Sequence, residues 1–459
     1  MIKLNKVHFI RPLIEKYQRS VPRYTSYPTA DKFQLSFESQ KIVTQITELS
    51  PKNPLSLYIH IPFCNTLCLF CGCNKIITND KSKIDIYLDY LEREIQLYVS
   101  LLTHTPQVVQ LHFGGGSPSW MSEAQISRIM NVLRRYFNLD NADEIAMEID
   151  PRHSDEQYVR HLKKEGFSRI SLGIQDFDPI VQKAVNRIQS FTDSNAILEA
   201  AHKYNFKSTN VDLIYGLPFQ TLSSFSSTID TIIKMHPERI ALFNYAHIPS
   251  LLMPQTRIKD NDLPPSNVKL DILQMSVEKL IDAGYLFIGM DHFALQDDSL
   301  SQALQNGTLQ RNFQGYSTFK DLNMLSFGVS SIGMINNHYY QNAKDLDGYY
   351  LNINNNTLPI IRGYQLSQDD IIRQHIIQKI MCQFKLNFNE IETLHNINFN
   401  HYFNNEVSAL KILSQDGLIE LSDNEFTVTN GGRFLIRNIA VVFDQYFNTT
   451  QPHRYSKSI

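Results

Sequence analysis

The sequence predicts an α/β protein built around a partial (β/α)6 barrel of the TIM type, with an N-terminal arm and a small, mainly helical C-terminal domain. Two observations predict this fold class. Between residues 51 and 292, short β-rich runs alternate with amphipathic helical runs, the pattern of a parallel sheet covered by helices. After residue 366 the order changes to helices, two short strands and a last helix, which indicates a separate winged-helix-like domain.

The barrel elements follow one another in regular order. The predicted strands are residues 55–61, 107–113, 144–149, 169–174, 210–216 and 239–247, with 284–290 as a candidate for a later addition. The predicted helices include residues 84–99, 123–137, 155–166 and 194–204. Most of them begin after a Ser, Thr or Asp that can cap a helix. In such folds the loops after the strands meet at one mouth, so we expect the chemistry there.

Three further segments complete the predicted organisation. Residues 1–50 form an arm, in which Pro22 and Pro28 bracket a tyrosine-rich stretch without helical or alternating period. Residues 293–365 are rich in Asn, Gln, Asp and Tyr and are predicted to be a lid and linker. Residues 366–459 form the winged-helix-like domain, and its last helices carry too little positive charge for a DNA-recognition helix.

Composition limits the possible partners. The chain has 459 residues, of which 42% are hydrophobic and 19% are charged, as in an ordinary globular protein. The net charge of -3 gives no long-range attraction for nucleic acid or an anionic membrane, so we expect neither. The first twenty residues lack the apolar stretch of a signal peptide, and no apolar run is long enough to span a bilayer. We therefore expect a cytoplasmic protein, and a monomer by default.

The cysteines carry the strongest chemical signal. Four of the five lie between residues 64 and 73, too close together for a disulfide framework. Cys64, Cys68 and Cys71 can converge on one metal centre, whereas a structural zinc site or a ferredoxin cluster would need four ligands. Cys73 is the alternative fourth ligand, but in an extended segment its side chain points away from Cys71, so we favour three thiolates. Cys382 stands in an apolar helical run and is predicted to be a buried hydrophobe.

This spacing resembles the defining C-x3-C-x2-C motif of the radical S-adenosylmethionine (SAM) superfamily. Phe70 supplies the aromatic residue that precedes the third cysteine in that motif, and HFGGGSPSW supplies a glycine-rich loop after the second strand. The resemblance implies a [4Fe-4S] cluster with three cysteine ligands. Its open iron binds SAM, and reduction then yields a 5′-deoxyadenosyl radical.

Further segments narrow the resemblance to the oxygen-independent coproporphyrinogen III oxidase family of haem synthesis. These segments are RYTSYPTA, YIHIPFC, CGCNKI, EIDPR, GIQDF, NVDLIYGLP, FNYAHIP, GMDHFA and RNFQGY. The family resemblance implies oxidative decarboxylation of two propionate side chains of coproporphyrinogen III to vinyl groups, which gives protoporphyrinogen IX. It also implies an external low-potential electron donor and an electron acceptor that the sequence does not identify.

The resemblance assigns site residues position by position. It implies catalytic roles for Tyr58, Cys64, Cys68 and Cys71, of which the three cysteines are the metal ligands. It implies binding of SAM, as one or two molecules, by Tyr58, Phe70, Gly72, Gly115, Gly116, Ser117, Glu148, Gln175, Arg187, Asp212, Ala246, Gln314 and Ile332. Gln314 and Ile332 match the second SAM site, and Ser117 stands where much of the family has Thr.

Simpler roles compete with several of these assignments. Glu148 and Asp212 are about as well explained as capping or salt-bridged acids without the resemblance. Tyr58 in a strand is a core residue by default. His60, His112, His247 and His292 are more often satisfied core or rim histidines than ligands. Because the substrate carries four carboxylates, we also hypothesise that basic residues of the arm and lid, such as Arg23 and Arg311, pair with propionates.

The main alternative function is that of the haem chaperone of the same superfamily, which transfers haem instead of decarboxylating a porphyrinogen. Two features disfavour it. That paralogue lacks the RYTSYPT arm, and it has Phe at the position of Cys73. A structural zinc protein with a DNA-binding winged helix is the third interpretation, and the low positive charge of the C-terminal domain disfavours it.

Overall fold

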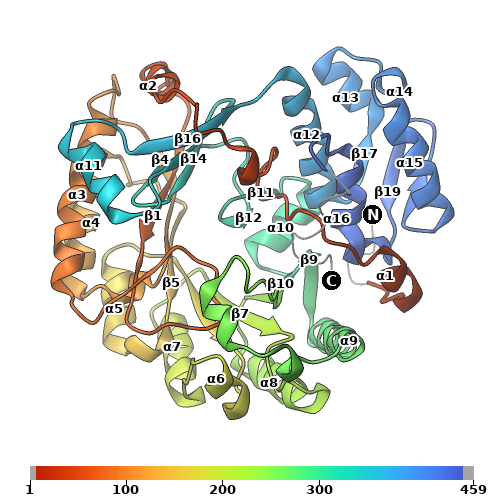
Figure 1. Ribbon diagram of the computed structural model, residues 1–459, viewed down its shortest axis with the longest axis horizontal. Helices are drawn as coiled ribbons and strands as arrows, with labels where there is room; N and C mark the ends of the chain where they lie inside the picture. Colours follow the sequence, from red (N-terminus) through yellow and green to blue (C-terminus); the bar gives the residue numbers. More distant parts are fainter. Residues whose placement is uncertain (1–6, 448–459) are drawn as a thin grey trace. The chain divides into compact units, whose positions relative to one another are not determined.

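The computed structural model describes residues 7–447 (Figure 1). The chain forms two compact units. Unit 1 comprises the described residues up to Lys32, the stretch Leu273–Lys320 and the described residues from Leu366 onward. Unit 2 comprises Phe33–Ile272 and Asp321–Gln365. Among residues 7–447, no helix is long and apolar enough to cross a membrane.

Unit 2 contains the predicted parallel strands. They are β1 (Leu55–Ile61), β4 (Val108–Gly115), β5 (Glu144–Ile149), β6 (Arg169–Gln175), β7 (Ser208–Tyr215) and β8 (Arg239–Asn244). Each is parallel to the next in this order. Leu57 and Ile59 of β1 and Leu111 and Phe113 of β4 are fully buried, as expected for strands covered on both faces. The α/β fold class is thereby confirmed.

Four more strands extend this sheet beyond β1. They are β13 (Asn323–Phe327), β14 (Ile332–Ile335), β15 (His338–Asn342) and β16 (Ile360–Gln365). The strand β13 runs parallel to β1, and β14, β15 and β16 follow as an antiparallel meander. Part of the segment predicted to be a lid and linker is therefore regular sheet.

Helices follow most of the parallel strands of unit 2. They are α3 (Ser82–Val99), α4 (Glu123–Tyr136), α5 (Glu156–Lys164), α6 (Pro179–Ala184), α7 (Phe191–Lys203) and α8 (Leu222–Met235). Ser122 and Gln125 form a capping box at the start of α4, and Thr221 and Ser224 form one at the start of α8. The unit also contains α2 (Gln40–Thr47) and α11 (Leu346–Asn354), and α9 (Ser266–Asp282) contains the chain position where the two units divide.

A buried glutamate of α3 is hydrogen-bonded to the segments that contain strands β13 to β16. The Glu94 carboxylate accepts hydrogen bonds from the Tyr349 hydroxyl at 2.6 Å, the Gly328 amide at 2.7 Å and the Asn342 side chain at 2.6 Å. Burial raises the pKa of Glu94 to about 7, although these donors lower it. The loop between β13 and β14 is therefore held by hydrogen bonds to α3.

Unit 1 combines N-terminal, middle and C-terminal segments. Before residue 366 its elements are α1 (Arg11–Tyr17), β9 (Tyr285–Gly289), β10 (His292–Leu295), α10 (Ser299–Asn306), β11 (Gln310–Asn312) and β12 (Gly315–Ser317). After it come α12 (Gln368–Gln383), β17 (Lys385–Asn387), α13 (Phe388–His395), α14 (Phe399–Tyr402), α15 (Asn404–Gln415), β18 (Ile419–Leu421), β19 (Glu425–Val428) and α16 (Ile436–Ala440). The predicted C-terminal strands correspond to β18 and β19.

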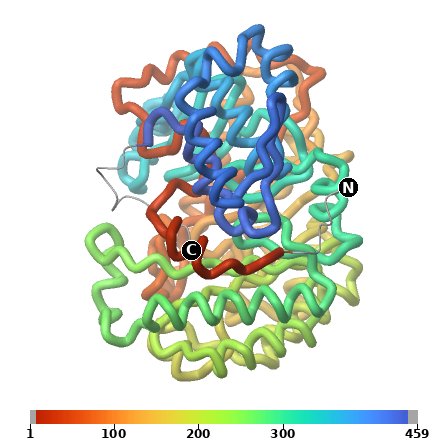
Figure 2. Tube along the Cα trace, turned by 90° about the vertical axis from the view of Figure 1, so that its right-hand side faces the viewer, coloured from red at the N-terminus to blue at the C-terminus, as the bar shows by residue number. Residues whose placement is uncertain are grey.

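The N-terminal segment runs along the C-terminal helices, as red beside blue in Figure 2. Lys16 pairs with Asp416 at 2.6 Å, the Asn438 side chain donates to the Tyr17 carbonyl at 2.8 Å, and the Tyr24 hydroxyl donates to Asp444 at 3.0 Å. The described part of the arm up to Lys32 is therefore packed within unit 1, where its backbone and side chains are hydrogen-bonded to the C-terminal region.

Candidate active site

The cysteine loop follows β1 directly. Cys64 ends the two-residue strand β2 (Phe63–Cys64), which pairs in parallel with β3 (Ile76–Ile77). The Thr78 amide donates to the Cys64 carbonyl at 2.8 Å, and the Cys71 amide donates to the Cys68 carbonyl at 3.3 Å. These bonds fold residues 64–78 into one compact loop that brings three of the cysteines together.

The three thiols lie close enough to influence one another. Burial, and after it the neighbouring thiols of Cys71 and Cys68, raises the pKa of Cys64 to about 12. In the part of the chain that the structure describes, no three His, Cys, Asp or Glu side chains are already arranged as a metal site. The fit to an iron–sulfur cluster therefore rests on the donor set, three thiols on one loop.

Cys73 differs from its predicted orientation. Its amide donates to the Cys71 sulfur at 3.4 Å, and interaction with the Cys71 side chain raises the pKa of the Cys73 thiol. The expectation that the Cys73 side chain points away from Cys71 was wrong, because residues 71–73 turn instead of continuing as an extended strand.

The glycine-rich loop packs directly on the cysteine loop. The Gly116 amide donates to the Ile61 carbonyl at 2.8 Å. A Cβ at Gly116 would lie 2.6 Å from the Pro62 carbonyl oxygen and 3.0 Å from the Cys64 sulfur, and Gly115 has a φ of +123°. Side chains cannot replace these glycines without moving the loop. Ser117 is buried beside them, with its hydroxyl 3.3 Å from that of Ser119.

Tyr58 stands at the centre of a stacked polar group. Its ring stacks on His112, with centroids 6.0 Å apart, and its hydroxyl lies 3.2 Å from His60 Nδ1. His112 Nε2 lies 3.6 Å from the Glu148 carboxylate, which also accepts from the Gly115 amide at 3.2 Å. The ends of β1, β4 and β5 thus bring Tyr58, Glu148 and the glycine-rich loop together, as the sequence predicts for parallel strands.

Ile332 joins the same region through β13. Its carbonyl accepts from the Ser326 hydroxyl at 2.6 Å, and Ser326 is the register partner of Tyr58. Ile332 is therefore attached to the strand beside Tyr58.

Asp212 lies on β7, and within the described part of the chain the hydrogen-bond donors to its carboxylate are uncharged. It accepts from the Asn210 side chain at 2.8 Å and from the Ser171 hydroxyl at 3.3 Å. Burial, and secondly the charge of Glu148, raises its pKa to about 7. A cationic or hydroxyl-bearing ligand would stabilise the ionised form of this carboxylate.

Several buried polar atoms near the strand ends of unit 2 lack a hydrogen-bond partner. They are His112 Nδ1, Gln175 Oε1, Arg187 Nε and Asn244 Oδ1. Gln175 ends β6 with a φ of +64°, and a Cβ at Gly173 would lie within 3.0 Å of both the Gln175 and the Arg187 side chains. Buried polar atoms are normally satisfied, so this set fits a polar ligand such as SAM.

Arg187 forms contacts that the sequence did not predict. Its Nη1 donates to Asp150 at 3.2 Å and to the Cys68 sulfur at 3.6 Å, and its Nη2 donates to the Gly173 carbonyl at 2.6 Å. Arg152 also bonds Asp150, at 2.6 Å, and reaches the Cys68 sulfur at 3.7 Å. Although burial opposes ionisation, the two arginines lower the pKa of Asp150 well below its ordinary value.

The comparisons with known proteins decide the family. Residues 58–232 match the model of the radical SAM superfamily, and residues 366–435 match the HemN C-terminal domain. The chain is 47% identical to an oxygen-independent coproporphyrinogen III oxidase of Salmonella typhimurium, over 95% of this chain and 94% of that protein. It is 44% identical to the oxidase of Pseudomonas aeruginosa, over 99% and 100%.

The chain belongs to the oxygen-independent coproporphyrinogen III oxidase family. It is also similar to the solved structure of coproporphyrinogen III oxidase from Escherichia coli, a radical SAM enzyme, with a TM-score of 0.91 and 44% identity over 96% of this chain and 100% of that one. These relatives favour the oxidase over the haem chaperone.

Other predicted residues of this family lie nearby in unit 2, with one exception. Gln255 joins two of them, because its side chain donates to the Phe70 carbonyl at 3.2 Å and to the Ala246 carbonyl at 3.1 Å. A Cβ at Gly72 would lie 3.3 Å from Leu252. Gln314 belongs to unit 1, where it lies between β11 and β12.

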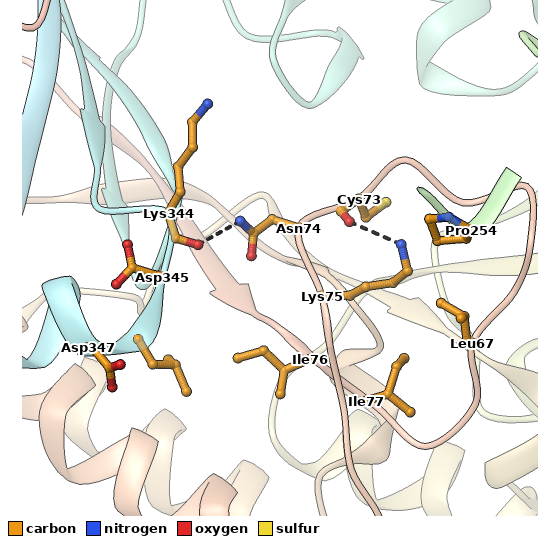
Figure 3. A pocket seen from close by; sticks show the side chains of 11 residues that line it. Leu67, Cys73, Asn74, Lys75, Ile76, Ile77, Pro254, Lys344, Asp345 and Asp347 are labelled. Atoms are coloured by element: carbon orange, nitrogen blue, oxygen red, sulfur yellow. Dashed lines mark hydrogen bonds between the residues drawn. The ribbon is translucent and has the colours of Figure 1, made fainter. Parts of the chain in front are cut away.

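A surface hollow of about 550 Å³ adjoins the cysteine loop (Figure 3). The Asn74 side chain donates to the Lys344 carbonyl at 2.8 Å, and Lys75 Nζ donates to the Cys73 carbonyl at 3.3 Å. The hollow is thus bounded by residues 73–77 of this loop and by residues 344–347, which lead into α11.

Sequence reasoning missed Asp150, Arg152 and Gln255 as members of the site. Asp150 and Arg152 stand in EIDPR, directly after β5. This segment contributes to the family resemblance, but it does not indicate which side chains Asp150 and Arg152 contact. Gln255 lies in an irregular segment, and no local pattern distinguishes it.

Proposed function

We propose that this chain converts coproporphyrinogen III to protoporphyrinogen IX by oxidative decarboxylation of two propionate side chains. The observation that carries the proposal is the cysteine loop after β1, in which the Cys64 thiol packs against the glycine-rich loop and lies close enough to Cys68 and Cys71 for their charges to affect its pKa, in a chain of this family. Each propionate loses a hydrogen atom from its β-carbon, then CO2 and one electron, and becomes a vinyl group. The hydrogen atom passes to the radical, and an external acceptor takes the electron.

The cofactors in this proposal are a [4Fe-4S] cluster held by Cys64, Cys68 and Cys71 and one or two molecules of SAM. When bound, they supply a 5′-deoxyadenosyl radical that removes the hydrogen atom. The unpartnered Gln175 and Arg187 atoms and the buried Asp212 carboxylate, whose hydrogen-bond donors are an amide and a hydroxyl group, support SAM binding by these residues. Gln314 and Ile332 are proposed for a second SAM molecule.

The residues around Tyr58 orient what binds beside them. His60 holds the Tyr58 hydroxyl and the His112 ring supports its face, so the phenol has one position. Glu148 is fixed by the Gly115 amide and can accept hydrogen bonds from an amino or hydroxyl group. Ser117 keeps a hydroxyl where much of the family has threonine.

Arg152 and Arg187 act on the cluster through Cys68. Both guanidiniums donate toward its sulfur, and Asp150 fixes both of them. Hydrogen bonds to ligating sulfurs stabilise the more negative, reduced state and raise the reduction potential. These arginines therefore contribute to setting the potential at which the cluster accepts an electron.

The same proposal includes the partners and the organisation of the chain. The cluster would require an external low-potential electron donor, and we expect a cytoplasmic monomer without nucleic-acid or membrane partners. The functional segments in this proposal are an arm at 1–50, a barrel at 51–292, a segment at 293–365 whose strands β13 to β16 extend the barrel sheet, and a winged-helix-like domain at 366–459, with residues 1–6 and 448–459 outside the described part of the chain. The match of residues 366–435 to the HemN C-terminal domain supports the last boundary.

An anaerobic assay tests the function. Protein reconstituted with iron and sulfide should hold four irons per chain and cleave SAM to 5′-deoxyadenosine when reduced. With coproporphyrinogen III present, chromatography of the oxidised products should show protoporphyrin IX. Stable haem binding without decarboxylation would instead establish the chaperone function.

Cysteine variants test the ligand set. Cys68→Ala should lose both the cluster absorbance and SAM cleavage, whereas Cys73→Ala should keep four irons and retain SAM cleavage. Loss of the cluster in Cys73→Ala, with retention in one of the other single variants, would identify Cys73 as a ligand.

A further inference from the structure

Unit 1 contains a second group of basic side chains, of which Arg311 and Arg437 are buried and Arg23 is half-buried. We call Arg23, Arg311, Arg437 and Asp291 the arginine group. Arg23 comes from the arm, Asp291 from the turn between β9 and β10, Arg311 from β11 and Arg437 from α16. The charges of Arg23 and Arg437 lower the pKa of Asp291. The charge of Asp291 in turn acts to raise the pKa of Arg311 and of Arg437. Four distant parts of the sequence thus bring charged side chains together within one unit.

Arg311 is fixed in position by its surroundings. It is the register partner of Tyr316 in the β11–β12 hairpin, and its guanidinium lies 4.7 Å from the centre of the Tyr316 ring. Its Nε donates to the Arg23 carbonyl at 3.4 Å, and its own carbonyl accepts from the Gln378 side chain of α12 at 2.9 Å. Backbone and ring therefore hold the guanidinium before any ligand binds.

One end of this guanidinium has no partner. Arg311 is 6% exposed, and its Nη1 has no hydrogen-bond acceptor among residues 7–447. Burial lowers the pKa of Arg311, and the charge of Arg23 lowers it further. A buried donor without an acceptor costs free energy that folding alone does not recover, so an anionic ligand is the natural partner for Nη1.

The charges of the arginine group do not balance. Asp291 forms an ion pair with Arg23. Arg437 donates from Nε to the Pro22 carbonyl at 3.0 Å and from Nη2 to the Val21 carbonyl. Within this group, three guanidiniums therefore face one carboxylate. A planar guanidinium with free N–H groups suits a carboxylate, which can accept two parallel hydrogen bonds.

We propose that Arg311 binds a propionate carboxylate of the tetracarboxylate substrate, with Arg23 and Arg437 contributing positive charge around it. This inference rests on the proposed function and names a residue that recognises its substrate. Tyr316 and the Arg23 carbonyl act as positioning groups for the guanidinium. A neutral porphyrin of the same shape would gain nothing from the group.

Titration of coproporphyrin III, the stable oxidised form of the substrate, tests the proposal. Binding to the full chain is followed by porphyrin fluorescence, with coproporphyrin III tetramethyl ester as the uncharged comparison. Arg311→Met should weaken binding of the tetra-acid by about tenfold or more and leave binding of the ester unchanged. Arg311→Lys keeps the charge but loses the fork, so its affinity for the acid should lie between wild type and Arg311→Met. Arg135→Met, on the exposed face of α4, is the matched control and should bind as wild type does.

Thermal unfolding separates recognition from a structural role. Since Arg311 Nη1 has no partner in the free protein, Arg311→Met should melt at the same temperature as wild type or higher. A clearly lower Tm, unchanged affinity for the tetra-acid, or an equal loss of affinity for acid and ester would each overturn the proposal. Failure of the proposed function itself would appear separately, as wild-type protein that releases no CO2 from coproporphyrinogen III.

Discussion

Two groups of buried arginines in this chain differ in how their charge is compensated. In unit 2, Arg152 and Arg187 share the carboxylate of Asp150 and both reach the sulfur of Cys68. In unit 1, Arg311 has a guanidinium nitrogen without an acceptor, and the arginine group contains a single carboxylate. The positive charge of the first group is opposed by the Asp150 carboxylate, and both guanidiniums donate toward the sulfur of Cys68, which we propose as a cluster ligand.

The difference separates two uses of the same residue type. A guanidinium that is ion-paired with a buried carboxylate, as Arg152 and Arg187 are with Asp150, supports structure and adjusts the charge of a neighbouring cofactor. A guanidinium that is buried without an ion pair can bind an anion, but its burial lowers the stability of the ligand-free protein. Replacing a charged residue of the first group should therefore lower the stability of the protein, whereas replacing Arg311 in the second group should not.

The largest expected effect is at Asp150. Asp150→Asn leaves two buried guanidiniums without their carboxylate, which should lower the free energy of unfolding of cluster-free protein by about 3 to 5 kcal/mol. Because the folded-state pKa of Asp150 is depressed, its stabilisation is present above the ordinary carboxyl pKa of about 4. It is lost only as the pH falls through the lower folded-state value. Urea denaturation of wild type and variant at pH 7 measures the difference. Equal midpoints would contradict the claim that Asp150 stabilises the protein by pairing with Arg152 and Arg187.

Asp212 sharpens the comparison, because this carboxylate is buried with amide and hydroxyl partners instead of guanidiniums. Its pKa is raised to about 7, so its protonated form stabilises the fold below about pH 4, and this contribution is lost as the pH rises through 7. Asp212→Asn should remove that pH dependence. Relative to wild type, the variant should gain about 2 to 4 kcal/mol between pH 4 and pH 8. A difference that stays constant over this range would mean that Asp212 has an ordinary pKa.

A smaller effect is expected on the cluster itself. Arg152→Met removes one donor to the Cys68 sulfur and one positive charge, so the reduction potential of the reconstituted cluster should fall by tens of millivolts. For a one-electron couple, about 59 mV corresponds to about 1.4 kcal/mol. Redox titration followed by electron paramagnetic resonance measures the shift. An unchanged potential would show that the guanidinium does not act on the cluster.

The smallest effect is expected at an exposed ion pair. Arg135 is 60% exposed and lies 3.2 Å from Glu92. Arg135→Met should change the free energy of unfolding by less than about 1 kcal/mol and leave the cluster potential unchanged. A loss comparable to that of Asp150→Asn would show that burial and compensation do not explain the difference between arginines.

The parallel strands could be predicted from local sequence because each one is short, apolar and bounded by a turn. The predicted ranges 55–61 and 144–149 coincide with β1 and β5, and β6 is one residue longer than predicted. The strands β13 to β16 were not predicted, because their Asn- and Tyr-rich sequence lacks clear alternation. The register of β13 beside β1 joins residues more than 260 positions apart, which no local pattern reveals.

The candidate site was predictable to a similar extent. Glu148, Gln175 and Asp212 could be placed because strand ends in such a sheet converge. The contact of Arg187 and Arg152 with Cys68 depends on how the cysteine loop folds against residues far along the chain. The hydrogen bond between Cys71 and Cys73 depends on a turn of the chain between them. These features arise from tertiary structure, and local spacing carries no signal for them.

The most direct test of the account counts the CO2 released from each substrate molecule. Coproporphyrinogen III labelled with ¹³C in its propionate carboxyl groups is incubated anaerobically with reconstituted protein, SAM, a low-potential reductant and an electron acceptor. The account predicts two molecules of ¹³CO2 for each molecule of protoporphyrinogen IX formed, together with 5′-deoxyadenosine. SAM cleavage without labelled CO2, in protein that carries the full cluster, would contradict it.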